Sequence, residues 1–562
     1  MSALDVGGHM QTGADLLVRC LEVEGVEYVF GLPGEELEDV LFSLRDSTIT
    51  FVPVRHEQGA AFMADVHGRL TGDAGVCLST LGPGATNLLT GVADAHLDRS
   101  PLVAITGQGG LERLHKESHQ HLDIVDMFEP VSKWNTQFTE PAIIHESIRK
   151  AFKLAEHEKP GATHVEFPED VAAENADERP LPPRNRVRRP SPDAKSISRA
   201  AALLTDADRP LVLAGNGGVR TRSSERLRSF VSNTNIPVVA TYMGKGAVSD
   251  ADERSLLTLD SGSADQADKA IERADVVCAV GYDIAEHDPE NWNPDKDKRI
   301  IHLDFEPAEV YEHYNPHVEV VCDIGAAIRE LETACEGVRT DREWYADLRE
   351  SLASEVFSKP GIDADTNTDA GIDTDANADA DSGTDTDSGA PFSVRGTLPI
   401  LREVMADADV LISDVGSHKM AIAKNYPTYE PNTCLISNGL ATMGISVPGA
   451  VAADLVTDSD VVAATGDGGF LMNAAEIETA TRLGCGFTVL VFNDDDYGLI
   501  SEQQTDSRGE STGTHLTNPD FVAFAESFGI DGYRPENWAE LDETLQEVVP
   551  ADRMTLVEVP VE

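Results

Sequence analysis

The stretch GDGGFLMNAAE, residues 466–476, places a single aspartate, Asp467, between glycines. The apolar residues before it predict a buried strand, and those after it predict a helix. Bare glycine amides at a helix N-terminus can hold a diphosphate, and a carboxylate beside them can bind a divalent cation that bridges the phosphates. Asp467 therefore predicts a diphosphate and metal site at the end of a strand.

A second acidic segment, VFNDDDYG, follows the next predicted strand and contains Asn493 and Asp494. Two neighbouring parallel strands that end in this way could supply two oxygens to one octahedral Mg²⁺. The alternative is two ordinary turns, because glycine and aspartate favour turns and the chain is rich in acids. We favour the metal site because the strand, the helix and the second acidic segment occur together.

Short β-branched runs that end in Gly, Asp or Asn alternate with helix-like stretches along the chain. These runs are PLVAIT, PLVLAG, DVVCAVG, DVLISDVG, VVAATGDGG and FTVLVFN. Buried parallel strands have this composition. The predicted fold is therefore α/β, with three doubly wound parallel-sheet domains at residues 11–180, 190–340 and 392–562.

The composition limits the partners and the compartment. The chain has 562 residues and a net charge of −55, which disfavours nucleic acid and anionic membranes and suits a solvated surface in high salt. Its seven cysteines form no CxxC pair, and no run is apolar enough for a secretory signal or a membrane span. We expect a cytoplasmic protein with buried thiols.

Residues 361–390 consist almost wholly of Asp, Thr, Ala, Asn, Gly and Ser. Such a segment cannot bury enough apolar surface to offset its chain entropy, so a disordered acidic linker is predicted. Its Asp-x-Asp repeats lack the glycine and the terminal glutamate of an EF-hand calcium loop.

The GDG motif followed by ND resembles the signature of thiamine-diphosphate enzymes. The resemblance implies that Asp467 and Asp494 bind Mg²⁺ through their side chains and Asp496 through its carbonyl. The segment VRHEQGAAFMAD, residues 54–65, is similar to the part of that family that supplies a catalytic glutamate, here Glu57. Its carboxylate would stabilise the cofactor tautomer that activates the thiazolium carbon.

Further segments resemble the same family and extend the predicted cofactor site. SDVGSHKM is similar to the segment that cradles the diphosphate, and Met443 matches the apolar wedge that bends the cofactor. The three domains would be the pyrimidine-binding, central and diphosphate-binding domains. The predicted cofactor-binding residues are Glu57, Gly416, Ser417, His418, Met443, Gly466, Gly468, Gly469 and Tyr497. Gly82 and Gly84, in a Gly-Pro-Gly turn, are expected to be architectural.

Nearly the whole chain outside the linker resembles acetolactate synthases of the catabolic, flavin-independent kind. The segments that carry this likeness include HKESHQHLDIVDMF, GYDIAEHDPENWNP and IIHLDFEPAEV. The resemblance implies that Gln120 lines the substrate pocket. His119 and His121 could be acid-base groups, but packing or solvent exposure explains them equally well.

The expected cofactors are thiamine diphosphate and Mg²⁺, without FAD. The glycine-rich turn LAGNGG lacks the third spaced glycine and the acidic partner of a dinucleotide fingerprint. Flavin-dependent relatives carry an arginine-containing stretch where this chain has GYDIAEHDP. An acid in place of arginine argues against FAD.

The resemblance implies that two pyruvate molecules condense to 2-acetolactate and CO₂ through an enamine of the cofactor. A homodimer or tetramer is expected, because the family builds each site between two chains. A decarboxylase of the same superfamily is an alternative, although Ile500 stands where those enzymes have a glutamate. A flavin-dependent pyruvate oxidase and a non-catalytic homologue are further alternatives. The route to valine or to acetoin, the second 2-oxo acid and a small regulatory subunit stay open.

Overall fold

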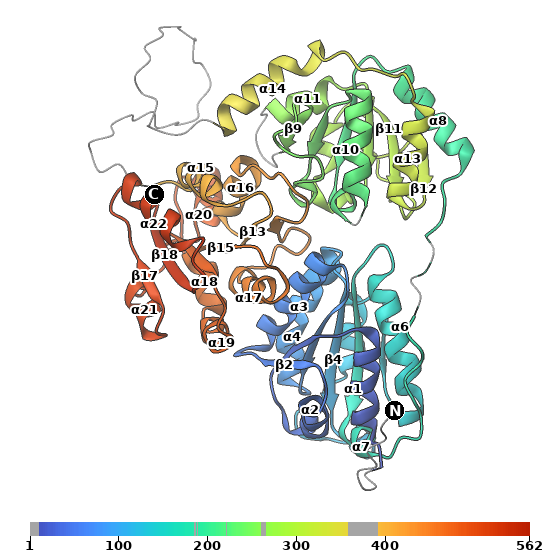
Figure 1. Ribbon diagram of the computed structural model, residues 1–562, viewed down its shortest axis with the longest axis vertical. Helices are drawn as coiled ribbons and strands as arrows, with labels where there is room; N and C mark the ends of the chain where they lie inside the picture. The colour runs from blue at the N-terminus through green and yellow to red at the C-terminus, as the bar shows by residue number, and fades with distance from the viewer. Residues whose placement is uncertain are drawn as a thin grey trace, which may run out of the picture.

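The computed structural model describes residues 10–561, apart from 185–186, 188, 221, 260–265 and 358–391. The predicted linker, 361–390, lies outside the described residues. Three six-stranded sheets, each covered by helices, make up the described chain, and every pairing between the named strands is parallel (Figure 1). The predicted α/β class with three doubly wound parallel sheets is confirmed.

The N-terminal sheet has the strand order β2-β1-β3-β4-β6-β5. Its strands are β1 Tyr28–Gly31, β2 Thr50–Pro53, β3 Gly75–Ser79, β4 Leu102–Gln108, β5 Asn135–Gln137 and β6 Ala162–Pro168. The helices of this domain are α1 Gly13–Glu24, α2 Glu38–Arg45, α3 Glu57–Thr71, α4 Pro83–Leu97, α5 Ile124–Phe128, α6 Ile144–Glu156 and α7 Glu169–Ala173.

The central sheet has the order β12-β11-β10-β7-β8-β9. Its strands are β7 Pro210–Ala214, β8 Val238–Ala240, β9 Ser255–Thr258, β10 Val276–Val280, β11 Arg299–Asp304 and β12 Val318–Val321. The helices here are α8 Ala194–Thr205, α9 Asn216–Val219, α10 Ser223–Thr234, α11 Gln266–Arg273, α12 Pro289–Trp292, α13 Ile324–Ala334 and α14 Glu343–Val356.

The C-terminal sheet has the order β14-β13-β15-β16-β18-β17. Its strands are β13 Val410–Ser413, β14 Cys434–Ile436, β15 Val461–Gly466, β16 Thr488–Asn493, β17 Asp531–Tyr533 and β18 Thr555–Pro560. The helices here are α15 Val394–Val404, α16 Ser417–Asn425, α17 Ser446–Val456, α18 Asp467–Asn473, α19 Glu476–Leu483, α20 Gly498–Arg508, α21 Phe521–Ser527 and α22 Trp538–Val548.

Each sheet has a point where the chain starts to wind in the opposite direction, and ligands of such folds bind beside that point. In the C-terminal sheet the point lies between β13 and β15, and in the central sheet between β10 and β7. The strands that form them were all predicted from short apolar runs, which are buried along their length.

The N-terminal and C-terminal domains share one hydrophobic core, in which α3 packs along α17 (Figure 1). The close approach requires Gly449, because a Cβ there would lie 2.8 Å from Cγ2 of Val66. The helix that begins at Glu57 is therefore fixed against the C-terminal domain of its own chain. No helix in the described part of the chain is long and apolar enough to cross a membrane.

Candidate functional site

A cavity of about 180 Å³ opens at the switch point of the C-terminal sheet. It lies at the carboxyl ends of β13, β15 and β16 and beside the start of α20. The structure brings every site residue predicted in this domain to its wall: Gly416, Ser417, His418, Met443, Gly466, Asp467, Gly468, Gly469, Asp494, Asp496 and Tyr497. Their roles toward a cofactor stay predictions.

The carboxylates of Asp467 and Asp494 follow neighbouring parallel strands, since Gly466 of β15 pairs with Phe492 of β16. Asp467 is the first residue of α18 and its side chain is only 2% exposed. Burial and the nearby Asp494 carboxylate raise the pKa of Asp467 to about 6, and burial also raises the pKa of Asp494. A divalent cation between them would offset this crowding, and carboxylate oxygens suit Mg²⁺.

Asn518 hydrogen-bonds to Asp467, and no sequence pattern indicated it. Its side-chain amide donates to Asp467, to Oδ1 of Asn493 at 2.9 Å and to Oδ1 of Asp495 at 2.8 Å. Among the described residues, no group of three or more His, Cys, Asp or Glu side chains is arranged to hold a metal ion. A magnesium ion here would thus take further ligands from a backbone carbonyl, phosphate and water.

The part of the wall beside these acids fits a phosphate group. A Cβ at Gly468 would lie 2.7 Å from the Tyr497 ring, so only glycine lets this backbone lie beneath the ring. The His418 ring is buried, which lowers its pKa to about 4, and its Nε2 has no hydrogen-bond partner. An imidazole whose proton lies on this unpartnered Nε2 can donate a hydrogen bond to a phosphate at the cavity.

The loop that carries Met443 is fixed by Asp414, a buried residue directly after β13. Its carboxylate accepts hydrogen bonds from the Gly444 amide at 2.8 Å and from the Ser446 hydroxyl at 2.9 Å. Sequence reasoning missed Asp414, although it follows its strand as Asp467 follows β15.

Glu57 is the first residue of α3 and its side chain is 5% exposed. Its Oε2 accepts a hydrogen bond of 3.0 Å from Nδ2 of Asn87, on α4. A Cβ at Gly84 would lie 3.4 Å from Oε1 of Glu57. Glu57 is not among the residues that line the cavity of Asp467, so one chain does not bring the two groups together.

Gln120 lies in an exposed loop beside the start of α4. Its φ is +55°, and its carbonyl approaches Gly82, where a Cβ would lie 2.5 Å from that oxygen. His119 is exposed and His121 is half-buried. None of these three loop side chains lines the cavity of Asp467.

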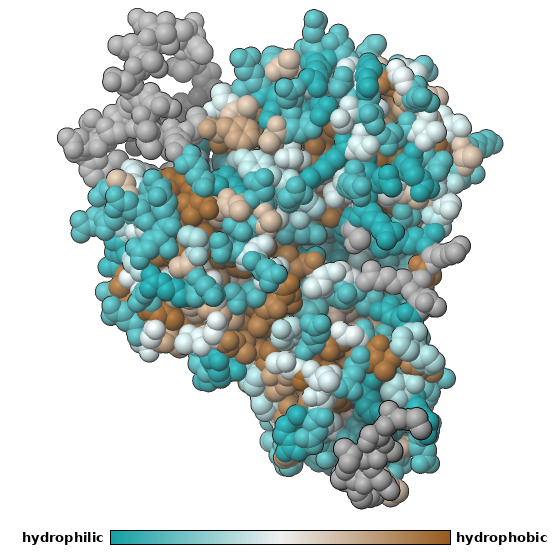
Figure 2. All heavy atoms as spheres, in the orientation of Figure 1, coloured by the Kyte–Doolittle hydropathy of each residue, from teal (hydrophilic) through white to brown (hydrophobic). Residues whose placement is uncertain are grey.

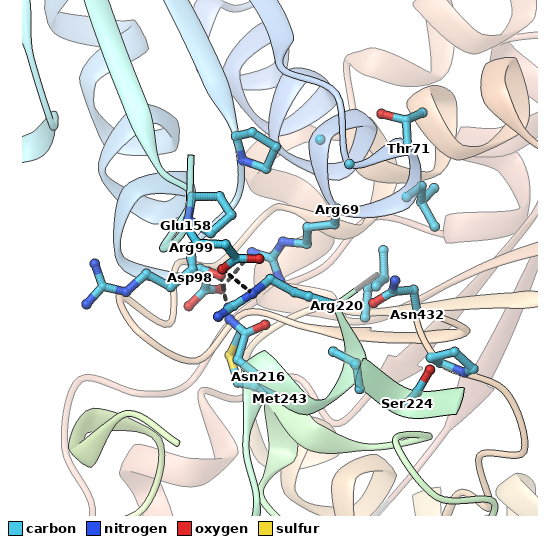
Figure 3. Close-up of a pocket in the computed structure, with 18 of the residues that line it drawn as sticks. Arg69, Thr71, Asp98, Arg99, Glu158, Asn216, Arg220, Ser224, Met243 and Asn432 are labelled. Carbon is cyan, nitrogen blue, oxygen red and sulfur yellow. Dashed lines mark hydrogen bonds and ion pairs between the residues drawn. The ribbon is translucent and has the colours of Figure 1, made fainter. Parts of the chain in front are cut away.

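A second cavity, of about 280 Å³, lies where the three domains meet (Figure 3). Its charged walls are largely paired: Arg69 lies 2.6 Å from Asp98, and Arg220 lies 3.1 Å from Glu158. Asn216 of the central domain donates to the Asp98 carbonyl at 2.8 Å. None of the predicted site residues lines this cavity, and its contacts tie the domains together.

The switch point of the central sheet holds a carboxylate of the chain itself. Both oxygens of Glu286 accept from the Asn216 amide, at 3.1 and 3.0 Å, and the Thr241 hydroxyl donates to Glu286. Burial, followed by the nearby Asp283 charge, raises the pKa of Glu286 to about 8. The glycine-rich turn after β7 thus contacts an internal acid where related folds bind phosphates.

Three family models match the chain, all of them domains of thiamine pyrophosphate enzymes. They are the N-terminal TPP binding domain over residues 11–127, the central domain over 197–331 and the C-terminal TPP binding domain over 414–559.

Curated relatives match over nearly the full chain. The acetolactate synthase of Bacillus subtilis is 34% identical over 98% of this chain and 93% of its own length. The probable acetolactate synthase large subunit of Methanocaldococcus jannaschii is 31% identical over 98% and 92%. The catabolic acetolactate synthase of Raoultella terrigena is 32% identical over 98% and 95%.

Proposed function

The chain belongs to the acetolactate synthase family of thiamine pyrophosphate enzymes, and we propose that it joins two pyruvate molecules into 2-acetolactate with release of CO₂. The observation that carries the proposal is the cavity at the β13/β15 switch point, where Asp467 and Asp494 face bare glycine backbone and Met443. A diphosphate with its magnesium ion suits this donor set.

We assign the cofactor contacts to two domains of the chain. Residues 392–562 would hold the diphosphate at Gly416, Ser417 and His418, and the magnesium ion at Asp467, Asp494 and the carbonyl of Asp496. Residues 11–180 would supply Glu57, whose carboxylate would hold a proton at the pyrimidine ring of the bound cofactor. When bound, thiamine diphosphate supplies a nucleophilic carbon that also accepts the electrons left by CO₂.

The protein surroundings control what this chemistry yields. Met443 would pack against the bound cofactor, and Gln120 would contact the substrate. Ile500, which is 46% exposed and lines the cavity, cannot donate a proton. Its position therefore favours carbon–carbon bond formation over aldehyde release by a decarboxylase.

We propose that the enzyme is of the catabolic type and works without FAD. The support is the Glu286 side chain at the central switch point, whose oxygens already occupy the Asn216 backbone amide that a flavin phosphate would use. A pyruvate oxidase would need that flavin. A yellow purified protein with flavin absorbance would contradict this part of the proposal.

The separation of Glu57 from the cavity of Asp467 supports a site shared by two chains. We propose a homodimer or a dimer of dimers, in which Glu57 of one chain serves the cavity of the other. The C-terminal domain exposes the apolar residues Leu440, Leu471 and Met472, which are suited to burial in an interface between two chains. Figure 2 shows apolar side chains gathered where this domain meets the N-terminal one, beside α3 and α17.

Other properties are proposed from the composition and from a relative's name. The seven cysteines are all buried and unpaired, which suits a reducing cytoplasm. The net charge of −55 suits a high-salt medium. A relative is named a large subunit, so a small regulatory subunit is a further candidate partner.

The test is to incubate the purified protein with pyruvate, thiamine diphosphate and Mg²⁺ and to measure acetolactate and acetaldehyde. We expect acetolactate as the main product, with activity lost on chelation of the metal. Acetaldehyde without acetolactate would indicate a decarboxylase instead. Light scattering on the same sample gives the oligomeric state.

A further inference from the structure

Glu476 ends the GDGGFLMNAAE stretch and has no role in the cofactor site described above. We propose that Glu476 is a positioning residue that sets the place of Glu57, by holding the turn that leads into α3. The inference rests on the proposed function, since it assumes that Glu57 acts on the cofactor. It concerns the C-terminal and N-terminal domains of one chain.

The Glu476 carboxylate accepts hydrogen bonds from the two backbone amides that precede Glu57. The amides of Arg55 and His56 each lie 3.0 Å from its Oε1. Its Oε2 accepts from the hydroxyl of Thr479 at 2.6 Å. Both oxygens are thus satisfied, and the backbone directly before Glu57 is bound to α19 of the other domain.

The packing around Glu476 leaves the carboxylate little freedom. Its side chain is 0% exposed, and a Cβ at Gly59 would lie only 2.7 Å from its Oε1. Glycine at position 59 therefore lets the carboxylate reach the first turn of α3. A buried carboxylate with this many fixed donors holds a single geometry.

The turn itself has no comparable support from its own side chains. His56 is the N-cap of α3, and its ring accepts only from the Gln58 amide, one residue beyond Glu57. The Glu57 side chain is held at its far end by Asn87. Glu476 thus fixes the backbone of Glu57, while Asn87 fixes its carboxylate.

Helix α18, which directly precedes α19, contacts the loop that carries Met443. Asn473, the last residue of α18, donates to the Gly444 carbonyl at 2.9 Å. The segment between Asp467 and Glu476 therefore connects the metal-binding acid, the Met443 loop and the turn before Glu57. Glu476 thus places Glu57 relative to the segment that carries Asp467 and contacts the Met443 loop.

The test compares wild type with Glu476→Ala, Glu476→Gln and the control Glu478→Ala, all as full-length holoenzyme. Glu478 lies on the same helix, and its contact with Arg55 is a longer, solvent-exposed one of 3.8 Å. Hydrogen–deuterium exchange of residues 54–59 reports directly on the two bound amides. We expect exchange at Arg55 and His56 to rise at least ~10-fold in Glu476→Ala, and to stay near wild type in the other two.

Kinetics provide the second measurement. In Glu476→Ala we expect kcat to fall by about 10-fold to 100-fold, since misplacing a catalytic group by 1 Å can have this effect. KM for pyruvate and thiamine-diphosphate affinity should change by less than ~3-fold. Glu476→Gln keeps an oxygen acceptor for both amides and should restore kcat. If the alanine variant does not fold, Glu476→Asp, which withdraws the carboxylate, carries the same comparison.

Protected amides in Glu476→Ala or Glu476→Asp would overturn the proposal. So would a loss in which kcat, cofactor affinity and thermal stability fall together and glutamine restores none. The exchange measurement is independent of the reaction: it still decides the role of Glu476 if no acetolactate is formed. A normal Glu476→Ala enzyme beside an inactive Glu57→Gln enzyme would refute this inference alone.

Discussion

The chemistry of the site depends on carboxylates that the fold has crowded at one point. Asp467 is buried next to Asp494, and both carry raised pKa values that a bound cation would lower. We predict that Asp467→Ala loses thiamine-diphosphate affinity, because no cation then anchors the phosphates. Calorimetric titration of cofactor with Mg²⁺ measures it, with Asp458→Asn as the control because Asp458 is exposed in the loop between α17 and β15. Unchanged affinity in Asp467→Ala would contradict the metal assignment.

The role of Glu57 can be tested by replacing it with glutamine, which carries an amide in place of the carboxylate. We predict that Glu57→Gln keeps the fold and most cofactor binding, and that turnover falls by ~10² or more, the usual scale for a positioned acid-base group. The isosteric amide can still meet Asn87, so packing should survive. Turnover is measured with thermal denaturation as the folding control, and an active glutamine variant would remove Glu57 from the mechanism.

Substrate choice is the third prediction at this scale. Gln503 is exposed on α20 beside Glu502, one turn beyond Ile500 of the cavity wall, and 2-oxobutyrate is larger than pyruvate by one CH₂. One extra buried CH₂ corresponds to about 4-fold to 100-fold in selectivity, and glutamine lacks the apolar face to cover it. We predict that pyruvate couples mainly to itself when pyruvate and 2-oxobutyrate are supplied at equal concentrations. A ratio of acetohydroxybutyrate to acetolactate above ~10 would contradict this.

Residues that follow strands could be predicted from the sequence, whereas the residues that hold the site in place by hydrogen bonds could not. Asp467 and Asp494 stand out because apolar runs end at them. Asn518 and Glu476 lie in no such pattern, and only folding brings them to Asp467 and to the turn before Glu57. Sequence spacing carries no information about hydrogen bonds between distant segments.

The same contrast holds for whole elements. Central strands such as β10 and β16 were predicted because burial on both faces makes them continuous apolar runs. Edge strands β5 and β17 read NTQ and DGY and were missed. They are only partly buried, and pairing with a neighbour rather than composition makes them strands.

An ionic cluster joins α3 and α4 to the end of β14. Arg69 lies 2.9 Å from Asp65 and 2.6 Å from Asp98, and it donates to the Ile436 carbonyl at 3.0 Å. The Ser437 hydroxyl donates to Asp94 at 2.8 Å, and the Asp98 carboxylate accepts from the Gly439 amide. One buried cation thus serves three acids and holds the segment before Met443.

We predict that Arg69→Met lowers the free energy of unfolding by about 3–5 kcal/mol, because it leaves buried carboxylates without a cation. Burial already raises the pKa values of Asp94 and Asp98. Protons therefore bind the folded state more tightly than the unfolded state. The loss of unfolding free energy in Arg69→Met should consequently shrink as the pH falls. Urea unfolding at several pH values measures it. Arg45→Met, whose pair with Asp46 is exposed, is the control and should change stability little.

At the scale of the whole molecule, the large negative net charge affects the stability of the fold. The chain carries 99 acidic and 44 basic side chains, so its acids cannot all be paired with bases. Like charges then repel across the folded surface more strongly than in the expanded chain. Salt shortens the range of this repulsion from about 10 Å at 0.1 M to about 3 Å at 1 M.

We therefore predict that the thermal midpoint rises steeply between about 0.1 M and 1 M KCl and more slowly above it, since screening is nearly complete by then. Stabilisation by exclusion of solute from the surface would instead grow steadily with concentration. A sucrose series at matched osmolality, which changes exclusion without screening, is the control. A midpoint that is flat or falls below 1 M KCl would show that the acidic surface does not destabilise the fold, and would remove the argument for salt adaptation.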